Sequence, residues 1–173
     1  MSKHKFYECI WNIKCFNRNK KLLWEEEHPN ILTDEGEKAI LDVFFRGKDS
    51  SYFSDLVNPK FYIGLCKGTV TESTILATIP GEPGLGVNGY NRSACERSDI
   101  GWPTIEKDEE DYRVVSKELS LTAVGGSIGP VNGAFLGTSL DDSGTLIGAV
   151  AMIIERTVLA GDTIIFQLRT KLK

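Results

Sequence analysis

Only one stretch of the chain has the periodicity of a long helix, and it lies among segments with the patterns of strands and turns. Residues 33–46 carry a wide apolar stripe made of Ile40, Val43 and Phe44, flanked by Leu41 and Phe45. Asp34 and Glu37 form a start similar to a capping box, and Gly47 is a natural stop. We therefore predict one helix that packs against a sheet in a mostly β domain.

The N-terminal part is predicted to form strands. Residues 6–16 alternate between apolar and polar side chains, which is typical of a half-buried strand, and the polar residues 17–21 predict a turn. A return strand begins at Leu22 and is expected to end at His28-Pro29-Asn30. Residues 60–66 form an apolar run typical of a core strand. Gly64 within it indicates close approach of the helix or a neighbouring strand.

The C-terminal half predicts further strands separated by turns. These strands cover residues 112–123, 131–138, 146–154 and 163–172, with turns at 125–126, 141–144 and 159–162. Residues 48–59, 80–89 and 98–111 are predicted to be long loops. The expected fold is a single domain, residues 1–173, with an antiparallel β-sandwich or jelly-roll-like architecture and one α-helix.

Composition disfavours several classes of protein. The net charge of −4 and the lack of a basic stripe argue against a nucleic-acid partner. The longest apolar run, residues 149–154, is too short for a membrane helix, and residues 1–5 do not begin a signal peptide. We therefore expect synthesis in the cytoplasm and no membrane partner. The cysteines, which form no C-x-x-C pair, are expected to be free thiols: Cys9, Cys15, Cys66 and Cys95.

Three motifs and one histidine suggest chemistry until their context is considered. Residues 84–89 fit G-x-G-x-x-G, but no strand pattern precedes them and no helix pattern follows. Residues 125–129 fit G-x-S-x-G, but Pro130 follows and both histidines lie far upstream. The acidic run 108–111 lacks the spacing of a calcium loop, and His28 beside three glutamates is a lone histidine. We predict a non-enzymatic protein with no cofactor and no metal site.

Several blocks of the sequence resemble small virion structural proteins of tailed phages. The first blocks are Leu23-Trp24-Glu25-Glu26, Asn30-Ile31-Leu32-Thr33, the helix Asp34 to Phe45, and Phe61-Tyr62-Ile63-Gly64-Leu65. Later blocks are Gly89-Tyr90-Asn91-Arg92, Trp102-Pro103, residues 117–122, residues 129–136 and residues 156–163. The likeness extends over nearly the whole chain. It implies a capsid decoration (cement) protein on the capsid surface, with no catalytic residues.

Such a protein would bind the major capsid protein and, as a second expected partner, other copies of itself. A trimer would suit the threefold positions of an icosahedral shell. The candidate interface residues are apolar or aromatic and lie in the long loops: Tyr52, Phe53, Leu85, Trp102 and Pro103. Phe53 and Trp102 could instead pin their own loops to the core. A tail, neck or baseplate component is one alternative. A carbohydrate or receptor-binding module with an exposed Trp11, Trp24 or Trp102 is another.

Overall fold

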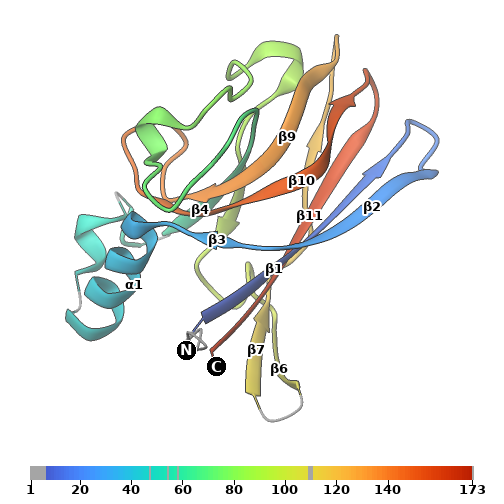
Figure 1. The fold of residues 1–173 in the computed structure, drawn as a ribbon. Helices are drawn as coiled ribbons and strands as arrows, with labels where there is room; N and C mark the ends of the chain where they lie inside the picture. The colour runs from blue at the N-terminus through green and yellow to red at the C-terminus, as the bar shows by residue number, and fades with distance from the viewer. Residues whose placement is uncertain (1–6, 47, 54, 58, 109–110, 173) are drawn as a thin grey trace.

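Two antiparallel β-sheets face each other, and an α-helix lies at the lower end of the pair (Figure 1). The computed structural model describes residues 7–46, 48–53, 55–57, 59–108 and 111–172. It describes only the backbone of Tyr7, Leu41, Phe44, Phe45, Asp108, Asp111 and Leu172. The predicted mostly β fold with one α-helix is confirmed within these residues.

The first sheet contains both ends of the described chain. Its strands run in the order β2 (Leu22–Pro29), β1 (Tyr7–Phe16), β11 (Thr163–Leu172), β7 (Asp111–Val115) and β6 (Thr104–Asp108), and β8 (Leu119–Thr122) also pairs with β11. β1 lies between β2 and β11 and pairs with β11 from Tyr7 opposite Leu172 to Phe16 opposite Thr163. The predicted N-terminal hairpin is confirmed, although its second strand continues to Pro29.

The second sheet has the order β3 (Ile31–Leu32), β10 (Leu146–Val158), β9 (Ile128–Gly137), β4 (Lys60–Cys66) and β5 (Ser93–Glu96). The turn at 141–144 joins β9 to β10 as predicted. The turn at 159–162 joins β10 in this sheet to β11 in the other, so these two consecutive strands are not paired with each other. Short 3-10 helices occupy Asp49–Ser51, Leu76–Thr78 and Val87–Gly89.

The main core lies between the sheets. Alternation along β1 turns Cys9, Trp11, Ile13 and Cys15 inward, where each is at most 3% exposed. The ring of Trp11 meets the ring of Phe166 on β11 edge to face, with 6.3 Å between the ring centroids. This packing confirms the buried face predicted for β1.

A second, smaller core covers the outer face of the second sheet. It consists of Cys66, Val70, Leu76, Phe135, Leu146 and Ala149. Phe135 also explains Gly64, because a Cβ atom there would lie 2.3 Å from the Phe135 ring. The close approach predicted at Gly64 is therefore made by the neighbouring strand β9. Both faces of this sheet are thus buried around β4 and β9.

The helix α1 (Asp34–Arg46) begins at a different cap from the one predicted. Thr33, not Asp34, caps it, because the Thr33 Oγ1 accepts a hydrogen bond of 3.1 Å from the Gly36 backbone N–H. The same hydroxyl donates to the carbonyl of Leu146 on β10. Gly36 is needed because a Cβ atom there would lie 2.0 Å from the Ile147 carbonyl oxygen. The predicted stripe places Ile40 and Val43 beside a cavity, while the side chain of Phe44 lies outside the described residues.

Two other predictions about strands are wrong. Residues 98–111 are not a continuous loop, because β6 pairs with β7 from Thr104 opposite Val115 to Asp108 opposite Asp111. Residues 112–123 are not one strand, because β7 and β8 pair with different parts of β11. β6 does not alternate between apolar and polar residues, so its pattern did not indicate a strand, whereas β7 falls almost entirely within the predicted strand 112–123.

Candidate interaction surface

Three loops meet at the upper end of the sandwich in Figure 1, opposite the helix and the two termini. Backbone hydrogen bonds join them: the Val124 N–H donates to the Asn88 carbonyl over 2.8 Å, and the Gly161 N–H donates to the Ala123 carbonyl over 2.8 Å. We call the surface formed by residues 84–89, 123–127 and 159–162 the apical surface. Its loops are held to one another as well as to the strands that they connect.

Glycines and one asparagine fix the shape of the apical surface. Gly86 and Gly89 have φ angles of +79° and +77°, which other residues rarely adopt. The Asn88 side-chain amide donates to the Ser127 carbonyl over 2.7 Å. Gly126 leaves the necessary room, since a Cβ atom there would lie 2.4 Å from the Asn88 Oδ1. The G-x-G-x-x-G and G-x-S-x-G matches therefore lie in two loops, and these loops pack together, which the sequence did not predict.

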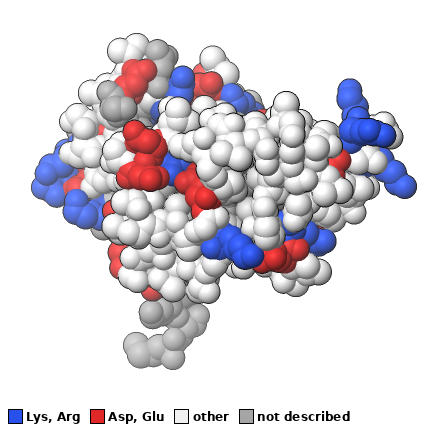
Figure 2. Space-filling view, turned by 90° about the horizontal axis from the view of Figure 1, so that it is seen from above, with Lys and Arg blue, Asp and Glu red and all other residues white. Residues whose placement is uncertain are grey.

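The apical surface exposes apolar side chains, and its one charged residue, Asp162, is buried. Leu85, Val87, Val124 and Leu159 are 45%, 56%, 63% and 58% exposed. Figure 2, which looks down on this end, shows a broad area without charged side chains, bordered by acidic and basic ones. Depletion of charge at the centre with a polar rim is typical of protein–protein interfaces. Contiguous exposed apolar surface likewise marks sites of interaction.

The five predicted interface residues fall at opposite ends of the molecule. Leu85 lies on the apical surface, whereas Tyr52, Phe53 and Trp102 line one cavity at the lower end. Pro103 is exposed beside Trp102. Phe53 is only 5% exposed and its ring packs edge to face on Phe61, with 5.4 Å between centroids. Phe53 therefore belongs to the core, and its placement at an exposed loop tip is corrected.

The prediction missed three apolar residues of the apical surface: Val87, Val124 and Leu159. A sequence signal exists for Val87 and Val124 but not for Leu159, because residues 119–140 contain no Asp, Glu, Lys or Arg, and residues 83–91 contain none either. In a chain that is 25% charged, such runs indicate either burial or a surface that excludes charge. The alternation of β8 and β9 accounts for burial in part of the first run, and Val124 lies in the turn between them.

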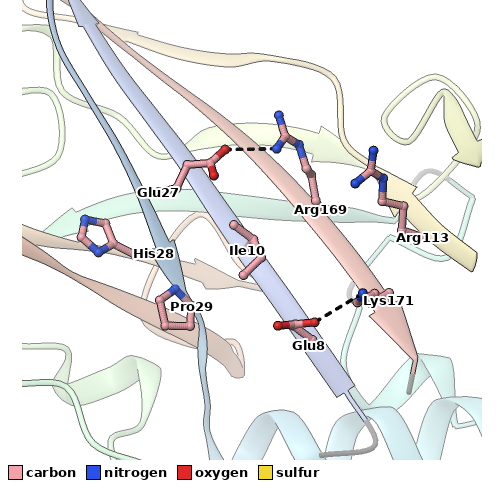
Figure 3. A pocket seen from close by; sticks show the side chains of 8 residues that line it. All are labelled: Glu8, Ile10, Glu27, His28, Pro29, Arg113, Arg169 and Lys171. Carbon is pink, nitrogen blue, oxygen red and sulfur yellow. Dashed lines mark hydrogen bonds and ion pairs between the residues drawn. The ribbon is translucent and has the colours of Figure 1, made fainter. Parts of the chain in front are cut away.

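A depression of about 440 Å³ lies on the outer face of the first sheet (Figure 3). Its basic side chains are already engaged with carboxylates. Arg169 donates to Glu27 over 3.0 Å, and the Lys171 Nζ lies 3.7 Å from the Glu8 Oε2, as the dashed lines show. Ile10 lies between these two pairs. The third basic side chain, Arg113, is paired with Glu106, which lies outside the depression. Each basic group thus has an acidic partner, and surface pairs of this kind contribute little to stability.

The three tryptophans on which the carbohydrate-binding alternative rests are buried or partly buried. Trp11 is fully buried. The ring of Trp24 is covered by the guanidinium of Arg156, 4.8 Å from the ring centroid, and Trp102 packs edge to face on Phe61 at 6.1 Å. Trp11 is therefore excluded as a sugar platform, whereas Trp24 and Trp102 are partly exposed and the carbohydrate-binding alternative stays a prediction.

Buried polar groups serve the fold. Burial, followed by the nearby Glu82 carboxylate, raises the pKa of the Tyr90 phenol, whose hydroxyl donates to Glu82 over 2.8 Å. The described residues contain no group of three or more His, Cys, Asp or Glu side chains that could hold a metal ion. The side chains of Asp108 to Asp111 lie outside this description. In the part of the chain that is described, no helix is both long enough and apolar enough to cross a membrane.

No family model matches the chain, and no curated protein or solved structure matches it either.

Proposed function

We propose that the chain is a non-enzymatic virion structural protein of a tailed phage, and specifically a decoration protein that stabilises the head shell. The apical surface carries this proposal, because none of its exposed side chains is charged, four of them are apolar, and hydrogen bonds between its loops hold it in shape. A surface that is already ordered loses little conformational freedom on binding. The resemblance of the sequence blocks to small tailed-phage virion proteins gives the class of partner.

The shell offers the same site many times, so that modest affinity at each site suffices when contacts add. In this proposal the major capsid protein contacts Leu85, Val87, Val124 and Leu159, while the helix and both termini face away from the shell. In this proposal three copies of the chain contact one another and form a trimer at each threefold position of the icosahedral shell. Tail, neck or baseplate attachment would use the same surface against a different partner.

The proposal is tested by adding the purified chain to phage heads that lack it and imaging the particles by electron cryo-microscopy. We expect density at regular positions over the icosahedral shell, with the upper end of the sandwich against it. Density confined to the tail, neck or baseplate would replace decoration by the alternative location. Absence of binding to any part of the particle would overturn the proposal.

Two variants locate the contact. Leu85→Asp and Val124→Asp should lower the amount of chain that co-sediments with heads while leaving the melting temperature nearly unchanged, because both side chains are exposed. Ile105→Asp is the matched control, since Ile105 is 73% exposed on the hairpin at the lower end. Equal loss of binding in all three variants would argue against the apical surface as the contact.

A further inference from the structure

The turn between β1 and β2, residues 17–21, concentrates positive charge, and we call it the basic turn. Arg18, Lys20 and Lys21 are exposed, and none of them forms an ion pair with a residue that the structure describes. Residues 9–24 contain no Asp or Glu that would balance them locally. Most other described Lys and Arg side chains do pair with a carboxylate. The basic turn therefore stands out on a chain whose net charge is −4.

Hydrogen bonds hold the basic turn in one shape. The Asn17 Oδ1 accepts from the backbone N–H groups of Asn19 and Lys21 over 2.9 and 3.0 Å. The Asn17 carbonyl accepts from the Lys20 N–H over 2.8 Å. The turn projects on the right of Figure 1, and Figure 2 shows basic side chains that project on the same side. Its cations are thus presented together on a convex end that needs little further ordering to bind.

An open depression at the start of α1 has the opposite charge, and we call it the acidic depression. It has a volume of about 510 Å³ and is lined by Ile31, Asp34, Thr71, Glu72 and Ser73. The Asp34 N–H donates to the Glu72 carbonyl over 2.8 Å, which joins the two acidic residues. Neither carboxylate forms an ion pair with a described residue. The helix N-terminus carries about half a positive elementary charge, so it offsets only part of theirs.

The basic turn and the acidic depression complement each other in charge and in shape. One is convex and basic, and the other is concave and acidic. Like charges held close together repel, and an opposite charge at contact distance relieves this repulsion on both sides. In Figure 1 the turn lies on the right and the start of α1 on the left, so the two features do not meet within one copy. Each therefore finds its complement on a second copy.

We propose that the basic turn of one copy binds in the acidic depression of a second copy. Such a contact joins different surfaces of the two copies, and its repetition head to tail closes a ring or forms an open chain. Exposed ion pairs are individually weak, so the contact gains strength where several copies are held on one surface. This inference does not rest on the decoration proposal, because it concerns copies of the chain alone.

Analytical ultracentrifugation of the purified chain tests the contact without phage heads. We expect the average molar mass to rise with protein concentration in about 0.01 M salt. It should fall to the mass of the monomer in about 1 M salt, because the screening length shrinks from about 30 Å to about 3 Å. A chain that stays monomeric in low salt up to its solubility would overturn the proposal, and so would self-association that salt leaves unchanged.

Reversal of charge on each side identifies the two surfaces. The turn variant is Arg18→Glu with Lys21→Glu, and the depression variant is Asp34→Lys with Glu72→Lys. Each should weaken self-association in low salt by about tenfold or more, because it places like charges across the contact. Melting temperatures check that both variants fold. If the depression variant does not fold, Glu72→Lys alone takes its place.

A control and a mixture make the test specific. Lys48→Glu with Lys107→Glu makes the same change in net charge at exposed residues elsewhere, and should self-associate more strongly than the turn variant. Mixing the turn variant with the depression variant should restore association, because each reversed surface then meets an opposite charge. Equal loss in the control would overturn the proposal, and so would a mixture that associates no better than its components. A monomeric chain whose turn variant binds phage heads less well would assign the basic turn to the capsid instead.

Discussion

The guanidinium of Arg92 and the carboxylate of Glu82 are joined by two hydrogen bonds, 2.8 Å from Nε to Oε1 and 2.6 Å from Nη2 to Oε2. The Arg92 side chain is completely buried, and its Cζ lies 5.1 Å from the centroid of the Phe135 ring. Arg92 also donates to Asp142 over 2.7 Å. One side chain thus ties the loop before β5 to the turn between β9 and β10.

Replacing Arg92 by Met should lower the free energy of unfolding by about 3–5 kcal/mol, because the largely buried Glu82 carboxylate loses its partner. Urea unfolding measures this change. Arg169→Met is the control, since its pair with Glu27 is exposed and should contribute about 0–1 kcal/mol. The double variant Glu82→Gln, Arg92→Met should recover part of the loss. Equal effects of Arg92→Met and Arg169→Met would contradict the role given to the buried pair.

Thr33 caps α1 and bonds to β10 through the same hydroxyl. Thr33→Val keeps the shape of the side chain and removes the hydroxyl, so we expect a loss of about 1–3 kcal/mol in the free energy of unfolding. Thr33→Ser keeps the hydroxyl and should cost much less. Denaturant titration of the two variants side by side checks the prediction, which would be wrong if Ser and Val had the same effect.

The Asp42 carboxyl makes the free energy of unfolding depend on pH in the acid range. The hydrogen bond from Tyr52, followed by those from Lys38 and Arg46, lowers the pKa of the Asp42 carboxyl from 3.8 to about 2. Because the pKa is lower in the folded chain, the stabilisation is present above pH 4 and is lost as the pH falls from about 4 towards 2. Tyr52→Phe should make this decline shallower, as seen by urea unfolding at a series of pH values. If the free energy of unfolding fell equally steeply with pH in Tyr52→Phe and in the unaltered chain, the prediction would be wrong.

The four cysteines should not react in the folded chain. All are buried, and burial raises the pKa of the Cys66 thiol to about 12 and of the Cys15 and Cys95 thiols to about 11. The thiolate is the reactive form. Ellman's reagent at pH 8 should therefore label no cysteine until urea unfolds the protein. A cysteine introduced at exposed Ala160 is the control and should react at once. Labelling of a native cysteine at that control rate would refute the prediction.

Local patterns predicted much of the fold. Alternation identified the buried face of β1, and Gly64 marked a real close approach, because each signal depends on residues within one strand and its neighbour. The sequence did not indicate which strands pair. The turn at 159–162 shows a reversal of the chain but not that β10 and β11 belong to different sheets. That choice depends on contacts between segments far apart in the sequence.

The candidate surfaces were harder to predict than the strands. Leu85 was identified from its loop, but Val124, whose backbone N–H donates to Asn88 of that loop, comes from a turn far along the chain. Tyr52, Phe53 and Trp102 were selected as exposed aromatics, yet they converge on one cavity because α1 closes the lower end. An aromatic residue in a loop indicates a side chain that makes extensive contacts. Whether those contacts are with a partner protein or with the core of the same chain depends on the packing.

The pairing of β1 with β11 also determines how the molecule responds to tension. The two strands are antiparallel, and Tyr7 lies opposite Leu172 at the same end of their shared ladder. Tethers attached beside these two residues would pull across the strands, parallel to the hydrogen bonds that join them. The hydrogen-bonded residue pairs of β1 and β11 would then separate one after another, beginning with Tyr7 and Leu172. Pulled in this way, the protein should yield at low force, which stretching of single molecules can measure.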